Sequence, residues 1–415
     1  MSMQVDWQLS IISVIAFVSI GVGLASLILF VRKKLVSSAL CKIKINDQVK
    51  QASGGETLLS ILLKLKVPVP SPCGGKATCK QCRVKVVEGG GPLLETDRAT
   101  FSAKELGEGW RLSCQCKVKE DIHVIVPEEF LDVKEIEATV ISNSNVATFI
   151  KELIVEIPDP IKYRSGAYLQ FHTPPFKTNT SDWKVTMDPK FYSDWERFKL
   201  FDQEIEVKES IIRAYSMASF PGEGRLLRFN IRIASPPKEG IPWGICSSYT
   251  FSLKPGDKIK LSGPYGESFM KEDDRELVFL IGGAGSSFGR SHIMHLFRTE
   301  NTKRKVTLWY GARSLKENIY ESEYRELDRD FSNFSYKLVL SDPLREDNWP
   351  TKEEDPIQTN FLFKAFELGQ LKGMEAPEDC LYYVCGPPLH NKAIMKLLDD
   401  YGVPRDNIVL DDFGS

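Results

Sequence analysis

One short loop of this chain, Cys73-Gly-Gly-Lys-Ala-Thr-Cys79-Lys-Gln-Cys82, constrains its fold more than any other stretch. A further cysteine follows some distance later in Arg-Leu-Ser-Cys114-Gln-Cys116. Three thiolates in a glycine-bearing loop, with a last ligand from a distant strand, suit a small iron–sulfur cluster that the backbone must wrap. The cysteines that the sequence predicts as cluster ligands are Cys73, Cys79, Cys82 and Cys114.

The spacing of these cysteines favours an iron–sulfur cluster over a zinc site or a disulfide framework. Plant-type ferredoxins space the first three cysteines by four and two residues and leave the fourth distant, and here the gaps are five, two and thirty-one residues. A structural zinc site usually draws on two short Cys or His pairs, whereas this chain has one, Cys79 with Cys82. A disulfide framework belongs to short secreted domains. We choose Cys114 as the fourth ligand and expect Cys116 to be a buried neighbour.

Residues 9–31 form the most hydrophobic stretch of the chain, without a charged residue. As a helix they would cross the hydrocarbon core of a bilayer. Arg32, Lys33 and Lys34 follow, so the positive-inside rule places the remainder of the chain in the cytoplasm. A cleaved signal peptide is the alternative, but no Lys or Arg precedes the apolar run, which is also too long for one. We expect an uncleaved single-pass anchor.

The length and the net charge of the chain limit the number of its domains and the kind of its partners. The 415 residues suffice for two to four domains. The net charge of −2 gives no basic field that would attract nucleic acid, so we expect no nucleic-acid partner.

Residues 38–130 are predicted to form a domain around the cluster loop. Strands are expected at 40–45, 83–87, 111–118 and 121–126, with a helix at 56–65. This order resembles a β-grasp [2Fe–2S] ferredoxin domain.

Residues 131–272 are predicted to form an antiparallel β-barrel, because several short strands alternate with turns. Residues 175–212 interrupt it with an insertion rich in charged and aromatic residues. The insertion either packs on its own domain or forms a docking surface for a partner.

Two motifs within this barrel are typical of a flavin site. In the stretch Arg213-Ala-Tyr215-Ser216, the arginine can pair with a phosphate, the tyrosine can stack on a ring and the serine can bond a flavin nitrogen. The second motif can present backbone N–H groups to a pyrophosphate at a helix start, and its candidate residues are Gly244, Cys246, Ser247 and Ser248. Together the motifs resemble the flavin-binding barrel of the ferredoxin–NADP reductase superfamily.

Residues 273–415 are predicted to form an α/β domain that binds a nicotinamide nucleotide. A buried-type strand at 277–281 runs into a glycine-rich turn and a helix, which is the context that a dinucleotide pyrophosphate needs. A second strand and loop at 306–314, a third strand at 336–340 and a fourth segment at 382–388 complete the predicted sheet. The candidate binding residues are Gly282, Gly283, Gly285, Arg313, Gly386 and Pro387. One departure is Phe288, where relatives of this superfamily usually carry proline.

The superfamily resemblance implies roles for two more residues. It places Cys385 beside the nicotinamide, where we assign it an orienting role, with a structural buried thiol as the alternative. It also places an aromatic near the C-terminus over the flavin face that the nicotinamide must reach. Phe413 matches that position, so its displacement would gate hydride transfer. Ser216, Cys385 and Phe413 are therefore the candidate catalytic residues.

The complete order of anchor, ferredoxin, flavin barrel and nicotinamide domain resembles the F-subunit family of the bacterial sodium-translocating NADH:quinone oxidoreductases. The resemblance implies a [2Fe–2S] cluster, FAD, NADH as donor, the bacterial inner membrane, and partner subunits that pass electrons to ubiquinone while Na⁺ moves. The fold class predicted is multidomain α+β with one transmembrane helix. Two alternatives remain: the reductase component of a mono- or dioxygenase, which carries the same modules without a span, and a non-catalytic ferredoxin-like electron-transfer module.

Overall fold

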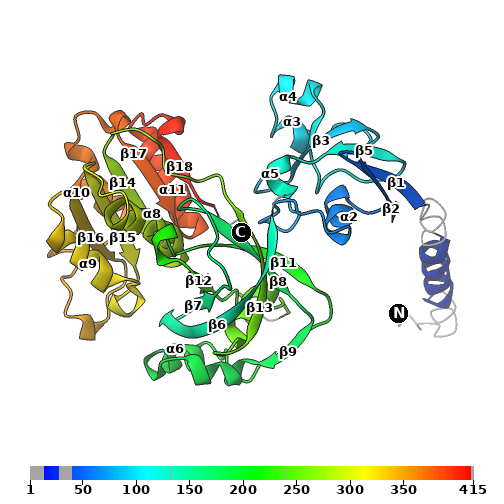
Figure 1. Cartoon of the computed structure of the whole chain (residues 1–415). Coiled ribbons are helices and arrows are strands. Elements are labelled where there is room, and N and C mark those ends of the chain that lie inside the picture. The colour runs from blue at the N-terminus through cyan, green and yellow to red at the C-terminus, as the bar shows by residue number, and fades with distance from the viewer. Residues whose placement is uncertain (1–13, 28–39, 132, 239, 413–415) are drawn as a thin grey trace, which may run out of the picture. The chain divides into compact units, whose positions relative to one another are not determined.

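The structure, a computed structural model, describes residues 14–27, 40–131, 133–238 and 240–412 (Figure 1). It divides into two compact units, one comprising residues 1–70 and 75–132 and the other residues 71–74 and 133–415. The second unit carries both the predicted barrel and the predicted nucleotide domain. The chain is thus a multidomain protein with helices and sheets in both units.

The first unit is a five-stranded sheet with one main helix. The strand order is β2-β1-β5-β3-β4, and the central strands β1 and β5 run parallel. The cysteine and isoleucines of β1 alternate inward and pack with the buried leucines of α2, which Thr57 caps through its hydroxyl. These elements are β1 (Leu40–Ile45), β2 (Gln48–Ser53), α2 (Leu58–Lys64), β3 (Arg83–Glu88), β4 (Trp110–Leu112) and β5 (Ile122–Ile125), with short helices α3 (Glu95–Arg98), α4 (Ala103–Gly107) and α5 (Glu128–Leu131).

One predicted strand of this unit is wrong in length. Residues 111–118 were expected to be extended, but β4 ends at Leu112. The carbonyl of Leu112 accepts the backbone N–H groups of Gln115 and Cys116, at 2.9 and 3.2 Å, which closes a turn. Cys114 therefore lies in a turn directly after the strand.

The barrel of the second unit is a six-stranded antiparallel sheet with the order β11-β8-β13-β6-β7-β12. Its two edge strands meet where the Ala218 N–H donates to the Arg228 carbonyl at 2.7 Å, which closes the sheet on itself. A continuous apolar core fills the interior. The strands are β6 (Lys134–Ala147), β7 (Ile150–Glu156), β8 (Tyr168–Thr173), β11 (Ile211–Ser216), β12 (Leu226–Arg232) and β13 (Lys258–Tyr265), and α7 (Ile245–Ser252) precedes β13.

The insertion folds onto this barrel. Its strands β9 (Phe176–Asn179) and β10 (Glu204–Val207) pair with each other, and between them lie η1 (Thr180–Thr186), η2 (Pro189–Phe191) and α6 (Tyr192–Arg197). Trp183, Phe191 and Trp195 are at most 2% exposed and belong to the barrel core. These aromatics therefore pack within the insertion's own domain. The predicted end of the insertion, residue 212, overlaps the first residues of β11.

The nucleotide domain is a five-stranded parallel sheet with the order β16-β15-β14-β17-β18. Alternate residues of β14 pack on opposite faces, one covered by α8 and α9 and the other by α10 and α11. Phe288 is fully buried, with its ring edge-on to His292 at 4.6 Å. The elements are β14 (Leu277–Gly282), α8 (Ser286–Arg298), β15 (Val306–Ala312), α9 (Glu321–Asp330), β16 (Phe334–Leu340), α10 (Leu362–Gly369), β17 (Leu381–Cys385), α11 (Pro388–Asp400) and β18 (Ile408–Leu410).

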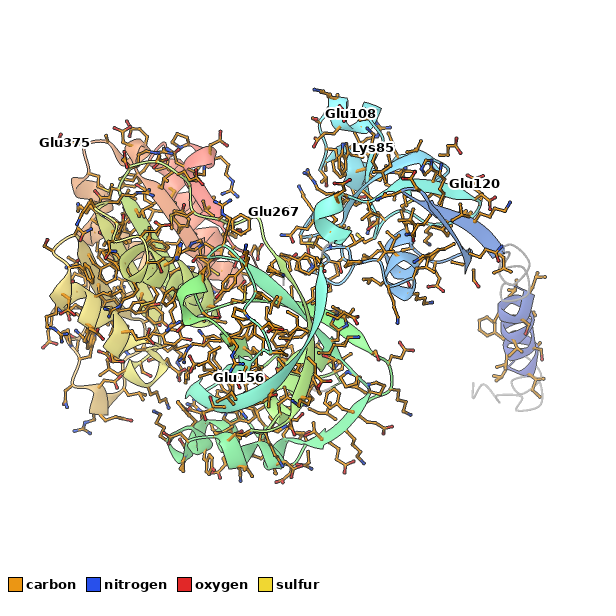
Figure 2. All side chains as sticks on the ribbon, in the orientation of Figure 1. Lys85, Glu108, Glu120, Glu156, Glu267 and Glu375 are labelled. Atoms are coloured by element: carbon orange, nitrogen blue, oxygen red, sulfur yellow. The ribbon has the colours of Figure 1, made fainter. Side chains whose placement is uncertain are left out.

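Charged side chains of both signs project from both units. Figure 2 shows Glu108, Glu120 and Glu375 at exposed positions, and Lys85 lies 3.9 Å from Glu108 in a solvent-facing ion pair. Such exposed pairs contribute little to stability. They suit a surface in contact with water and agree with the balanced charge of the sequence.

The predicted membrane span is only partly described. Residues 14–27 are helical and exposed, whereas residues 9–13 and 28–31 of the predicted span lie outside the described residues. Among the helices that the structure describes, none combines the length and the apolar character needed to cross a bilayer.

Candidate functional site

The cysteine loop between α2 and β3 has a backbone that glycine makes possible. Gly74 and Gly75 adopt left-handed conformations with φ of 64° and 90°, and Ala77 and Lys80 do so with φ of 64° and 58°. Left-handed residues turn successive N–H groups toward one concave side, which stabilises negative charge. For non-glycine residues this conformation is strained and persists where the surroundings impose it. The loop thus has the form of an anion-binding cradle.

Two of the predicted ligands meet beside this loop. The Cys82 and Cys114 thiols hydrogen-bond to each other, and this contact together with burial raises the pKa of Cys82. A Cβ on Gly75 would lie 3.8 Å from the Cys114 Cβ, so the loop passes close to Cys114. Cys73 is buried, whereas Cys79 keeps partial exposure.

Two of the cysteines form a pair of the kind that a two-iron cluster requires. Within the described ranges, no three Cys, His, Asp or Glu side chains converge as a mononuclear site would require. A [2Fe–2S] cluster held by four cysteines asks for thiolates in pairs, and Cys82 with Cys114 is such a pair. Cys116 is 1% exposed and its thiol donates to the Gly90 carbonyl at 3.5 Å, so it points into the protein core.

The predicted flavin strand β11 lies beside the start of α7. The Tyr215 phenol hydrogen-bonds with the Cys246 thiol, which Thr173 also contacts at 2.9 Å. Burial raises the pKa of both Tyr215 and Cys246, and the Arg213 guanidinium lies near enough to oppose this rise. The Arg213 guanidinium also donates to the Ile212 carbonyl at 2.8 Å. The Arg213 guanidinium and the N-terminus of α7 therefore lie near each other, and both can bind a pyrophosphate.

The start of α7 has two properties of a phosphate cradle. A Cβ on Gly244 would lie 2.5 Å from the Ala234 Cβ and 2.7 Å from the Ser247 Oγ, so this position tolerates only glycine. The Ser248 hydroxyl is fully buried and has no hydrogen-bond partner. Because buried hydroxyls are almost always satisfied, an unpaired one beside a helix N-terminus fits a missing ligand oxygen. These residues fit the diphosphate of a flavin nucleotide.

A hydrogen bond joins the flavin strand to the C-terminal strand of the nucleotide domain. The Ser216 Oγ donates to Asp411 Oδ2 at 3.0 Å, and the Asp411 N–H donates to the Val384 carbonyl at 3.0 Å. Burial raises the pKa of Asp411 to about 6. Burial, with Asp411 and Asp412 nearby, also raises the pKa of the fully buried Cys385 thiol well above its usual value. Ser216, Asp411 and Cys385 thus form one polar cluster, in which Asp411 keeps partial exposure.

The glycine turn after β14 reaches this cluster. A Cβ on Gly285 would lie 2.3 Å from the Cys385 carbonyl oxygen and 3.1 Å from its Sγ. Any side chain at this position would push apart the ends of β14 and β17. Gly283 adopts φ of 57° in the same turn. The structure therefore brings together the two motifs, predicted separately, that follow these neighbouring strands.

A cavity of about 300 Å³ opens beside the glycine turn, at the carboxyl ends of the parallel strands. Open α/β sheets bind nucleotides at this edge. Its lining includes Gly282, Gly283, Arg313, Glu317, Phe361, Pro387 and His390. His390 donates from Nε2 to the Leu280 carbonyl at 3.2 Å, and burial lowers its pKa, which favours the neutral ring. The residues fit a nicotinamide nucleotide, with apolar surface for rings and a glycine turn for phosphates.

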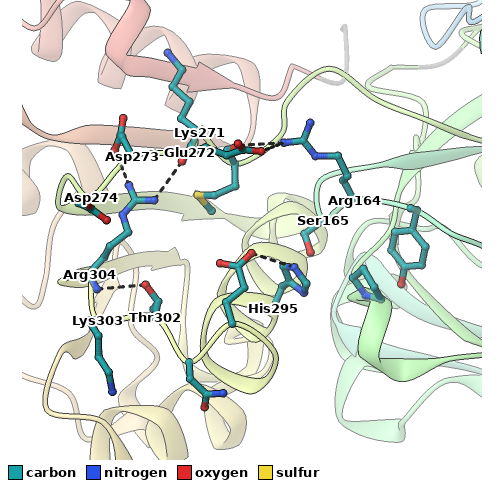
Figure 3. A pocket seen from close by; sticks show the side chains of 15 residues that line it. Arg164, Ser165, Lys271, Glu272, Asp273, Asp274, His295, Thr302, Lys303 and Arg304 are labelled. Atoms are coloured by element: carbon teal, nitrogen blue, oxygen red, sulfur yellow. Dashed lines mark hydrogen bonds and ion pairs between the residues drawn. The ribbon is translucent and has the colours of Figure 1, made fainter.

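A second cavity, of about 780 Å³, lies at the opposite, amino ends of β14 and β15 (Figure 3). Its walls carry polar and apolar surface in similar amounts, and several of its cations are already engaged. Arg304 donates to the Arg275 and Lys271 carbonyls at 2.7 and 3.3 Å and pairs with Asp273. His295 contacts Glu300 at 3.2 Å. This cavity is a polar joint between the barrel and the nucleotide domain, remote from the glycine turn.

The structure groups most of the predicted residues and adds several. It brings together Cys82 with Cys114, Arg213 and Tyr215 with α7, and the glycine turn with Cys385. Within the described part of the chain, it does not bring Cys73 and Cys79 into one metal-holding group with the other two cysteines. Arg313 lies at the cavity edge, half-exposed and 3.5 Å from Asp342. Phe413 lies outside the described residues. Sequence reasoning missed Asp411, although an acidic residue shortly before the predicted terminal aromatic was a signal. It also missed Thr148, Glu317 and His390, which belong to no recognisable motif.

Comparisons with known proteins identify two domain families and close relatives along almost the whole chain. Residues 43–119 match the 2Fe-2S iron-sulfur cluster binding domain family, and residues 279–396 match the oxidoreductase NAD-binding domain family. The Na(+)-translocating NADH-quinone reductase F subunit of Chlamydia caviae is 59% identical over 97% of each chain. Its counterparts from Chlamydia pneumoniae and Marinomonas sp. are 58% and 46% identical, again over 97% of this chain.

Two solved structures share the fold. The Amycolatopsis cytochrome P450 reductase GcoB matches with a TM-score of 0.60 at 21% identity, covering 90% of this chain and 99% of its own. The ferredoxin reductase in carbazole 1,9a-dioxygenase matches with a TM-score of 0.56 at 20% identity, covering 90% and 98%. At these identities the likeness concerns architecture alone.

Proposed function

The chain belongs to the family of Na(+)-translocating NADH-quinone reductase F subunits, and from that premise we propose that it admits electrons from NADH into such a membrane complex. NADH gives up a hydride, which carries two electrons, whereas a [2Fe–2S] cluster accepts one. A flavin is the carrier that receives electron pairs and releases them singly. The protein therefore needs FAD as the electron carrier that receives the hydride from NADH and passes single electrons to the cluster.

The observation that carries this proposal is the 3.0 Å hydrogen bond between Ser216 and Asp411. It joins the strand that would hold the flavin to Asp411, whose N–H donates to Val384 of β17. The loop after β17 carries Pro387, which lines the nicotinamide cavity. A hydride moves only between atoms in contact, so the two nucleotides must meet at such a junction.

The residues around the FAD site have distinct roles in this proposal. Arg213 and the N-terminus of α7 bind the diphosphate, Tyr215 lies against the flavin, and Ser216 presents its hydroxyl to a ring nitrogen. Asp411 orients that hydroxyl by accepting its hydrogen bond at Oδ2. The remaining proposed FAD contacts are Gly244, Cys246, Ser247 and Ser248.

The nucleotide side of the junction orients NADH. The turn formed by Gly282, Gly283 and Gly285 lets the backbone approach the pyrophosphate. Gly386 and Pro387 shape the loop after β17, and we assign the neutral Cys385 thiol the role of orienting the nicotinamide. Arg313 stands at the cavity edge. Phe413 shields the flavin face until NADH displaces it; unchanged NADH kinetics in a Phe413→Ala variant would remove this role.

The proposed cluster ligands are Cys73, Cys79, Cys82 and Cys114, and the left-handed loop supplies N–H groups to the cluster sulfides. We further propose that residues 9–31 anchor the chain in the bacterial inner membrane, with its folded units in the cytoplasm beside the other subunits that lead to ubiquinone. The support is an uncharged run followed by Arg32, Lys33 and Lys34. Extraction of the full chain from membranes by alkaline carbonate would contradict this anchor.

An anaerobic titration tests the proposed function. The full-length protein, carrying FAD and its cluster, would be mixed with less than one equivalent of NADH. We expect the flavin absorbance to fall and the reduced cluster to give its low-temperature paramagnetic signal. A flavin that stays oxidised would refute NADH oxidation. A bleached flavin without a cluster signal would refute the transfer step.

Purification from detergent-solubilised membranes separates this function from that of an oxygenase reductase. We expect other membrane polypeptides of the sodium-translocating complex to accompany the chain, together with NADH-dependent quinone reduction. Recovery with an oxygenase instead would support the alternative, for which the present similarity concerns only the fold.

A further inference from the structure

The turn between β6 and β7 forms one wall of the nucleotide cavity. Ala147 and Phe149 line the cavity from this turn, and Ile150 continues the wall into β7. Glu317, in η5 (Leu315–Glu317) after β15, lines it from the nucleotide domain. The shape of the cavity thus depends on how the barrel turn is held against η5.

Thr148, at the centre of this turn, is 2% exposed and fully engaged. Its N–H donates to Glu317 Oε2 at 3.0 Å, and its hydroxyl donates to the other oxygen of the same carboxylate. Its carbonyl accepts the Trp195 indole N–H at 2.7 Å. One threonine therefore joins the cavity wall, the nucleotide domain and helix α6 of the insertion.

Helix α6 makes a second contact with η5. The Lys316 Nζ donates to Asp194 Oδ2 at 2.5 Å, and the two side chains are only 23% and 14% exposed. The same Asp194 oxygen lies 3.5 Å from the Thr148 hydroxyl. Shielding from water strengthens such a pair and makes its geometry costly to break. Lys316 adjoins Glu317, so Asp194 fixes the segment that carries the cavity carboxylate.

The insertion is itself rigidly attached at this point. The Trp195 ring stacks on Phe201 with 5.5 Å between centroids, and both belong to the barrel core. On the other side of the wall, the buried Lys151 Nζ donates to the Phe251 carbonyl at 3.1 Å and to the Thr186 hydroxyl of η1. The insertion therefore contacts both the turn, at Thr148, and the strand that follows it, at Lys151.

We propose that the insertion, residues 175–212, is a positioning element for NADH, and that Asp194 is its positioning residue. Asp194 and Trp195 hold the β6–β7 turn and η5 at the spacing that the bound nucleotide requires. The inference rests on the proposed function, because it assumes that the cavity beside the glycine turn receives NADH. It predicts an effect on NADH binding and none on FAD binding or on the maximal rate.

The test compares steady-state NADH oxidation by the full-length holoprotein and its variants. Asp194→Asn removes the charge without changing size, and Lys316→Met removes its partner. We expect each to raise the KM for NADH roughly three- to tenfold, in line with the coupling of contacting pairs, with kcat and flavin content unchanged. The double variant should show little further increase, because both changes break one contact.

Two further variants complete the design. Trp195→Phe keeps an aromatic ring in the core but loses the hydrogen bond to Thr148, so it should raise KM by a smaller factor. Asp188→Asn is the matched control, since this aspartate lies on the same insertion in an exposed pair with Lys190 at 3.6 Å. Its KM should equal that of the wild type.

The outcomes separate the inference from the function beneath it. Unchanged KM values in the Asp194, Lys316 and Trp195 variants of a protein that oxidises NADH would overturn the positioning role alone. A parallel loss of kcat and flavin would also overturn it, because the insertion would then be a general stabiliser. Failure of the wild type to oxidise NADH would overturn the proposed function itself.

Discussion

The cysteine loop and the junction between Ser216 and Asp411 are built in opposite ways. The loop is a single short segment whose conformation comes from its own left-handed residues. The junction unites side chains 195 positions apart in the sequence. The loop needs only its own backbone to take its shape, and one further proposed ligand, Cys114, comes from a turn later in the chain. The junction needs every strand between its parts to pair in register.

The register of the parallel sheet shows what the distributed site requires. Ile281 pairs with Cys385 at the ends of β14 and β17, which places the glycine turn beside the Cys385 loop. Val384 pairs with Leu410 on β18, and the next residue, Asp411, then reaches Ser216. A slip of one residue would turn these side chains to the other face of the sheet. Damage to the loop should therefore stay local, and damage to the sheet ends should affect hydride transfer.

Loss of one proposed cluster ligand gives the largest expected effect. Cys79→Ala should abolish the low-temperature paramagnetic signal of the reduced cluster completely, because one iron loses a thiolate. FAD content and flavin reduction by NADH should persist, since the flavin site belongs to another unit. Electron paramagnetic resonance and flavin absorbance measure both properties on the same sample.

A matched variant guards this prediction. Cys116→Ala removes an equally buried thiol whose hydrogen bond goes to the Gly90 carbonyl. It should keep the cluster signal at full intensity. An intact signal in Cys79→Ala, or its loss in Cys116→Ala, would contradict the ligand assignment. Loss of FAD from Cys79→Ala would show that the flavin site depends on the cluster site.

Crowding of the glycine turn should have the next largest effect. In Gly285→Ala the new methyl group would meet the Cys385 carbonyl oxygen at 2.3 Å, and backbone cannot yield as a flexible side chain does. We expect the rate of flavin reduction by NADH to fall roughly 10- to 100-fold, because small displacements of reacting groups are costly. The cluster signal after chemical reduction should be unchanged. Stopped-flow absorbance measures the rate.

Gly373→Ala is the control for this variant, because a methyl group there meets nothing within 4 Å. It should reduce flavin at the wild-type rate. A normal rate in Gly285→Ala would show that β14 and β17 can separate without loss of function, which would refute the close approach.

What the sequence could predict follows the same contrast. Cysteine spacing and glycine turns carry their chemistry locally, so the cluster loop, the flavin strand and the nucleotide turn were all predictable. Asp411, Thr148 and Glu317 are ordinary residues that act only because distant segments meet. The strand expected at 111–118 was too long because hydrogen bonds to the Leu112 carbonyl close a turn, which no alternation of residues signals.

The insertion shows a second limit of the sequence. Its aromatic residues allowed either packing or docking, and burial of Trp183 and Trp195 decides for packing. Its contact with η5, through Asp194 and Lys316, has no local signature, because oppositely charged residues are common in any chain. Pairing between charges so distant in sequence appears only in the folded protein.

The pH dependence of stability at Asp411 gives the smallest expected effect. It tests whether burial of this carboxylate lowers the melting temperature of the protein. Its pKa is raised to about 6 by burial, so between pH 4 and 6 the folded protein binds more protons than the unfolded chain. Stability attributable to this group is then present at low pH and declines as the pH rises through about 6. Asp411→Asn, which cannot ionise, should melt a few degrees above the wild type at pH 8. That advantage should shrink toward pH 5. Asp159→Asn, at an exposed site of the barrel, is the control and should show no such trend. If the melting temperature of Asp411→Asn exceeded that of the wild type more at low pH than at pH 8, the prediction would be wrong, because the surroundings would then stabilise the carboxylate.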